Sequence, residues 1–98
     1  MKAVMIICNM IVGDEVKDAL ATLKIRGFTQ WNEVQGKGSE DGDPHMGTHA
    51  WPSLNSSFLV VLPEGEVEGL LDAVKEIEKG ARQQGIRAFV WSVEQTVG

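Results

Sequence analysis

Two segments of the chain are apolar at nearly every position. Residues 3–12 read AVMIICNMIV, with Asn9 as the one polar interruption, and residues 58–62 read FLVVL. Successive side chains of a β-strand point to opposite faces, so both faces of these strands would be apolar. This pattern is typical of central strands that are buried on both sides. Residues 28–35 (FTQWNEVQ) mix apolar and polar side chains, which fits a strand at a sheet edge, and residues 86–93 (IRAFVWSV) predict a fourth strand.

Apolar residues at helical spacing predict two helices between these strands. The first stripe is Val16, Ala19, Leu20 and Leu23, and the second is Val67, Leu70, Leu71, Val74, Ile77 and Ala81. We expect the first helix at about Asp14 to Arg26, because Asp14 can cap it and Gly27 can end it. We expect the second at about Glu64 to Gln84, because Pro63 suits a helix start and Gly85 follows its end.

The resulting order is strand, helix, strand, strand, helix, strand. Two right-handed crossovers in this order predict an α+β, ferredoxin-like βαββαβ fold: a four-stranded antiparallel sheet with two helices on one face. The strands at 3–12 and 58–62 then occupy the middle of the sheet, in agreement with their apolar pattern. With 98 residues we expect a single domain, 1–98. Two helices cover only one face, so we expect another copy of the chain to cover the other.

A long segment without periodicity separates the second and third predicted strands. It runs from about Gly36 to Ser57 and reads GKGSEDGDPHMGTHAWPSLNSS. Unstructured inserts of this length are uncommon in small domains and usually carry function. We therefore interpret it as the part of the molecule that meets a ligand or partner.

The composition excludes several classes of protein. The formal net charge is −5, whereas nucleic-acid binding requires clustered Lys and Arg, so we expect no nucleic-acid partner. No apolar run approaches the length of a membrane span, so we expect no direct membrane insertion. The apolar start resembles a signal peptide only faintly, since it is β-branched and has one flanking Lys. The single cysteine, Cys8, excludes an intrachain disulfide and fits a reducing compartment, so we expect a cytoplasmic protein.

Several segments together resemble the PII signal-transduction superfamily. They are Gly27-Phe-Thr, the strand that leads through Val34-Gln into Gly36-Lys37-Gly38, the helix segment GDEVKDALATLKIRG, and the closing ARQQGIRAFVWSV. The resemblance covers nearly the whole chain. It implies a homotrimeric regulatory protein whose sheets face the trimer axis and whose insert is a T-loop. It also implies a small effector, such as ATP, ADP or AMP, in clefts between subunits, and a target such as a membrane transporter.

The effector site implied by this resemblance includes Gly36, Lys37, Gly38, Arg82 and Arg87. Glycines let the backbone approach a phosphate, and guanidinium groups can bind phosphate or carboxylate oxygens in a fork. The alternatives are a flexible strand exit at Gly36–Gly38, a helix-end cation at Arg82 and an exposed edge residue at Arg87. The chain departs from the family in having no basic tail after the last strand and no tyrosine.

A metal site is the alternative function. His45 and His49 are separated by three residues, and Asp43 is nearby, which is a ligand set suited to Zn or Cu. This would make the chain a metal-binding PII-like or CutA-type protein of divalent metal homeostasis. The opposing interpretation is two solvated loop histidines.

Trp51 and Pro52 form an apolar group on the otherwise polar insert. They either dock on a partner, as aromatic anchors often do, or pack back on their own domain. No nucleophile, base and orienting residue can be recognised from spacing, so we do not expect an enzyme. A third hypothesis is a self-assembling scaffold that has no small ligand.

Overall fold

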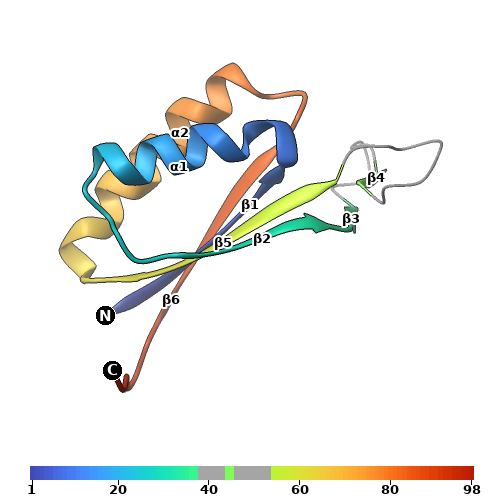
Figure 1. Cartoon of the computed structure of the whole chain (residues 1–98). Helices are drawn as coiled ribbons and strands as arrows, with labels where there is room; N and C mark the ends of the chain where they lie inside the picture. Colours follow the sequence, from blue (N-terminus) through green and yellow to red (C-terminus); the bar gives the residue numbers. More distant parts are fainter. Residues whose placement is uncertain (38–43, 46–53) are drawn as a thin grey trace.

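The computed structural model describes residues 1–37, 44–45 and 54–98. Four strands form one antiparallel sheet in the order β2-β5-β1-β6. Two helices lie on one face of this sheet, as Figure 1 shows. The elements are β1 (Lys2–Asn9), α1 (Gly13–Thr22), β2 (Thr29–Val34), β3 (Gly36–Lys37), β4 (Pro44–His45), β5 (Asn55–Leu62), α2 (Val67–Gly80) and β6 (Ile86–Ser92). The predicted ferredoxin-like fold is confirmed, and β1 and β5 occupy the middle of the sheet as the apolar pattern indicated.

The hydrophobic core lies between the sheet and the two helices. Alternate residues of the central strands point into it, and each is at most 3% exposed: Val4, Ile6 and Cys8 from β1, and Phe58, Val60 and Leu62 from β5. The helices contribute the predicted stripes, with Val16, Leu20, Leu70 and Val74 all buried. Burial of each such side chain stabilises the fold by about 1.5–3 kcal/mol.

Helix α1 ends earlier than predicted, at Thr22 rather than Arg26. The Ile25 amide donates to the Leu20 carbonyl (2.9 Å) and the Lys24 amide to the Ala21 carbonyl (3.0 Å). These two bonds form a Schellman motif, which needs a left-handed residue between them. Lys24 takes that conformation, with φ 61°. The helix is therefore ended by a lysine, and Gly27 is not required for it.

Three other boundaries also differ from the sequence prediction. Strand β1 ends at Asn9 instead of Val12, because the Asn9 carboxamide oxygen accepts from the Ile11 amide (3.0 Å) and caps a short 3₁₀ helix. Helix α2 begins at Val67 after a 3₁₀ turn, Glu64–Glu66, and ends at Gly80 rather than Gln84. Strand β5 begins at Asn55, so three residues assigned to the insert belong to the sheet.

The face of the sheet opposite the helices carries large apolar side chains. Met5 and Ile7 of β1 point to this face and are half-buried. Four neighbours on it are exposed, at 42–49%: Trp31, Val61, Phe89 and Trp91. Ala3 is buried there because it lies in register between Val61 and Trp91. We call the face of the sheet that carries these residues the open face, and no helix covers it in Figure 1.

Among the described residues, no helix combines the length and the apolar character needed to cross a membrane.

Candidate functional site

The base of the long insert is more ordered than the sequence indicated. Gly36 pairs with His45, and Lys37 with Pro44, so β3 and β4 form a two-residue antiparallel ladder. This ladder extends beyond the end of β2 and β5 (Figure 1). A register shift between Trp31 and Val34 precedes it, where Glu33 has φ 57°. Bulges of this kind bend a strand and redirect it, and here the redirected strand leads into the insert.

Gly36 approaches the buried side chain of Asn55 closely. A β-carbon added at Gly36 would lie 2.5 Å from the Asn55 amide nitrogen, well inside van der Waals contact. Asn55 is itself only 9% exposed. A side chain at this position would force the end of the Asn55 side chain to move, so packing as well as strand-exit flexibility favours glycine here.

A small polar cluster supports the same region from the other side of the strand. The Ser56 hydroxyl donates to the Asn32 side-chain oxygen (2.9 Å), and the Gln30 amide donates to the same atom (2.8 Å). Sequence reasoning missed this cluster because Asn32 and Ser56 are 24 residues apart. The only local signal was the run of polar residues that precedes the apolar part of β5.

The second part of the predicted effector site is the turn between α2 and β6. Gly85 has φ 85°, a conformation that glycine adopts without strain, and its amide donates to the Ala81 carbonyl (3.1 Å). Arg82 lies exposed in this turn. Arg87 follows on β6, exposed and directly opposite Ile7, so its side chain is on the open face. Neither arginine forms an ion pair with another described residue.

Both parts of the site lie at one end of the sheet, but one chain does not bring them into contact. Gly36 lies beside Asn55, Asn55 is paired with Asn9, and the Asn9 amide donates to the Gly85 carbonyl (3.2 Å). This path crosses about three inter-strand spacings of ~4.8 Å each, or roughly 14 Å in all. In one subunit the backbone at Gly36 is therefore separated by the width of two strands from the turn that leads to Arg87.

Several predicted residues lie outside the described part of the chain: Gly38, Asp43, His49, Trp51 and Pro52. The backbone of His45 is described, as part of β4. Within residues 1–37, 44–45 and 54–98, no three His, Cys, Asp or Glu residues come together as a possible metal site. The metal hypothesis and the role of Trp51 and Pro52 therefore stay predictions.

The single cysteine is a core residue, as its mid-strand position predicted. Cys8 is 2% exposed and points toward the helices. Burial, together with the nearby negative charge of Glu15, raises the pKa of its thiol from 9.0 to about 11. The thiol is therefore protonated at neutral pH and is not an activated nucleophile.

Comparisons with known proteins agree with this architecture. Residues 1–98 match the sequence profile of the family described as "Nitrogen regulatory protein P-II". Two solved structures of CPII from Thiomonas intermedia K12, a nitrogen regulatory PII-like protein, are similar in fold. One, bound to ADP and bicarbonate, has a TM-score of 0.74 at 21% sequence identity, and the match covers 92% of this chain and 82% of the CPII chain. The other, bound to ADP, AMP and bicarbonate, has a TM-score of 0.76 at 20% sequence identity, and the match covers 99% of this chain and 93% of the CPII chain. No curated protein matches the chain.

Proposed function

Because the chain belongs to the nitrogen regulatory protein P-II family, we propose that it is a homotrimeric regulator that binds an adenine nucleotide between subunits. Its long insert then controls a target protein, for which a membrane transporter is our first candidate. The observation that carries this proposal is the divided site. Gly36 and Lys37 follow the edge strand β2, whereas Arg82 precedes and Arg87 lies on the opposite edge strand, β6, at the same end of the sheet. A second copy of the chain can complete what one copy leaves open.

The open face supports the assembly part of the proposal. Three aromatic side chains on it, Trp31, Phe89 and Trp91, remain 44–49% exposed in the single chain. A contiguous apolar surface of this kind marks an interaction site more often than a solvent-facing one. On β6, the position next to Phe89 on this face, toward the end of the sheet that carries the insert, is Arg87. Assembly through the open face would therefore place this guanidinium close to a subunit boundary.

The charge distribution supports an anionic effector at that boundary. Arg82 and Arg87 have no ion pair among the described residues, so no described carboxylate competes with phosphate oxygens for their guanidinium groups. The close approach of Gly36 to Asn55 brings the backbone of the insert base against the sheet, where a ligand can meet its amides. Nucleotides are also the ligands of the CPII structures.

The insert suits control of a partner rather than catalysis. Binding at its base would favour one arrangement of the β3–β4 ladder over others, and this is how an effector can change the affinity of a loop for a target. The only thiol of the chain is buried and protonated. Regulation, and not an enzymatic step, is therefore the function that we propose.

Isothermal titration calorimetry tests the proposal directly. ATP, ADP, AMP and cyclic AMP are titrated into the assembled protein, with and without bicarbonate. We expect Arg87→Gln to weaken nucleotide binding by about ten- to hundred-fold, since a hydrogen bond to a charged group contributes about 1.5–3 kcal/mol. Lys75→Gln on α2 removes an exposed cation elsewhere and should leave the affinity unchanged. Absence of binding heat with every nucleotide would refute the nucleotide part of the proposal, and a monomeric protein would refute the assembly part.

A further inference from the structure

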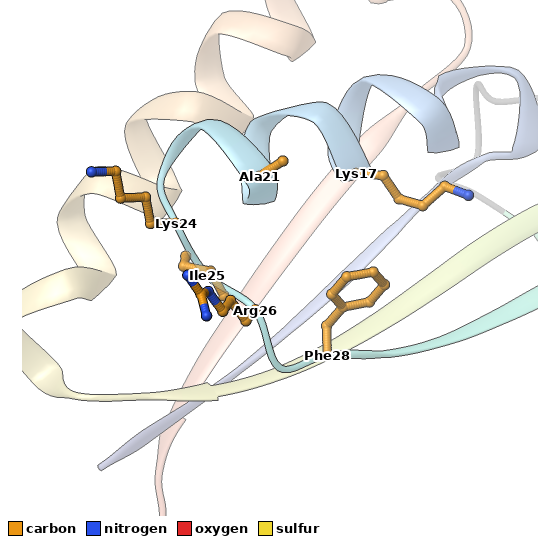
Figure 2. Close-up of a pocket in the computed structure, with 6 residues that line it drawn as sticks. All are labelled: Lys17, Ala21, Lys24, Ile25, Arg26 and Phe28. Carbon is orange, nitrogen blue, oxygen red and sulfur yellow. The ribbon is translucent and has the colours of Figure 1, made fainter.

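A pocket lies on the helix-covered side of the sheet, between the end of α1 and the start of β2. Its volume is about 540 Å³, and Figure 2 shows its six lining residues: Lys17, Ala21, Lys24, Ile25, Arg26 and Phe28. Pockets for small organic ligands span about 300–1,000 Å³. The volume is therefore sufficient for a ring-sized molecule.

The apolar centre of this pocket is held by the core. The Phe28 ring rises from the start of β2 toward α1 (Figure 2) and packs against Phe58, with ring centroids 6.0 Å apart and planes tilted by 51°. Phe58 is fully buried, so it fixes one side of the Phe28 ring while 38% of Phe28 stays exposed. Ile25 is placed opposite by the Schellman turn at Lys24. The pocket thus presents a supported aromatic surface rather than a loose side chain.

The rim of the pocket is positively charged, which is unusual in a chain of net charge −5. Three of the six lining residues are cations and none is acidic. Lys17 lies 3.8 Å from Asp14, whereas Lys24 and Arg26 have no ion pair within the described part of the chain. Figure 2 shows Lys17 above the Phe28 ring, whereas Lys24 lies beyond Ile25 and Arg26 and points away from the ring, so Lys17 and Arg26 are the cations on the Phe28 side of the pocket.

We propose that this pocket binds a small aromatic carboxylate, with its ring against Phe28 and its charge at the cationic rim. A flat apolar body gains from stacking on a supported ring. A carboxylate gains from the Arg26 guanidinium group, which has no ion pair with a described residue, and from the nearby charge of Lys17. Within one chain this pocket and Arg87 lie on opposite faces of the sheet, because Phe28 contacts the core side whereas Arg87 is on the open face.

The test follows backbone amide signals of the ¹⁵N-labelled, assembled protein while 1-naphthoate is added. We expect saturable shifts at Ala21 and Ile25, and a weaker response to the uncharged analogue 1-naphthalenemethanol. Removal of one exposed charge, in Arg26→Gln or Lys17→Gln, should weaken 1-naphthoate binding by about two- to five-fold. Phe28→Leu keeps an apolar contact with Phe58 and should weaken binding by about two- to ten-fold.

Lys75→Gln is the matched control, because Lys75 and Asp72 form the same exposed i, i+3 pair on α2 (3.9 Å) as Lys17 and Asp14 do on α1. It should bind 1-naphthoate as the wild type does. Equal weakening in this control, shifts confined to the open face, or no saturation below about 10 mM would overturn the proposal. Displacement of 1-naphthoate by ADP would show that the pocket is not a separate site. Calorimetry with nucleotides reports on the proposed function independently of all these outcomes.

Discussion

Introducing a carboxylate at Phe89 is expected to break the assembly while leaving the fold of each subunit intact. Phe89 is 49% exposed on the open face and pairs with Met5 across β6 and β1, so it contributes little to the core between sheet and helices. A large aromatic buries about 150–250 Å² when it is covered completely, so roughly 100 Å² of Phe89 remains for an interface. At about 25 cal/mol per Å² this area contributes about 2.5 kcal/mol, or close to a sixty-fold change in affinity. The buried, unpaired carboxylate of Phe89→Asp adds a further cost of several kcal/mol.

Sedimentation equilibrium, and light scattering coupled to size-exclusion chromatography, measure the mass of the assembly. We expect the wild type at three times the mass of one chain and Phe89→Asp at the mass of one chain, both with the same far-ultraviolet circular dichroism. Val97→Asp is the control, since Val97 is fully exposed in the C-terminal tail and the substitution adds the same charge. A wild-type protein that is monomeric at high concentration, or a Phe89→Asp variant that assembles normally, would refute the argument that the open face is an interface.

Three further predictions concern stability and metal binding. Lys24→Gly should raise the free energy of unfolding in urea by about 0.5–1 kcal/mol, because relief of the left-handed strain exceeds the backbone entropy that glycine adds; Lys24→Ala keeps the strain and should give no gain. The pKa of Cys8 is raised from 9.0 to about 11, so the folded state keeps the thiol proton up to a higher pH than the unfolded state does. The free energy of unfolding is therefore unaffected by this group below pH 9, and it decreases as the pH rises from 9 to 11. The loss between pH 8 and pH 10.5 should amount to about 2 kcal/mol, and a comparison of unfolding free energies at these two pH values should show it in the wild type but not in Cys8→Ala. If the insert binds Zn or Cu, replacing His45 and His49 together by Ala should abolish metal uptake in equilibrium dialysis, and an unchanged stoichiometry would exclude these ligands.

The site could be predicted only in part from the sequence. The glycines of the insert base and the two arginines were recognised by resemblance, and the structure places Gly36 and Arg87 at the same end of the sheet. Their separation by β5 and β1 could not be foreseen, because distance along the chain does not reveal how many strands lie between two residues in the sheet. The Asn32–Ser56 hydrogen bond and the pocket beside Phe28 were missed for the same reason, since each joins segments that have no common local pattern.

The sequence by itself determined the elements and their order. Side-chain periodicity is a local property: residues 3–12 and 58–62 are apolar at both parities, which predicted the two central strands, and the stripes of α1 and α2 were expected to face them. Only residues 10–12 depart from this, because they form a 3₁₀ helix. Tertiary structure decided where each element ends. Asn55 and Ser56 are polar, yet they belong to β5 because β1 pairs with them and buries them. The left-handed residue Lys24 ends helix α1, because the chain must turn there to reach Phe28 and the edge of the sheet. The packing of its neighbours Leu23 and Ile25 against the core compensates for the strained backbone of Lys24. Local pattern therefore specified the fold, whereas contacts between distant segments specified the bulge, the turn, the divided effector site and the pocket beside Phe28.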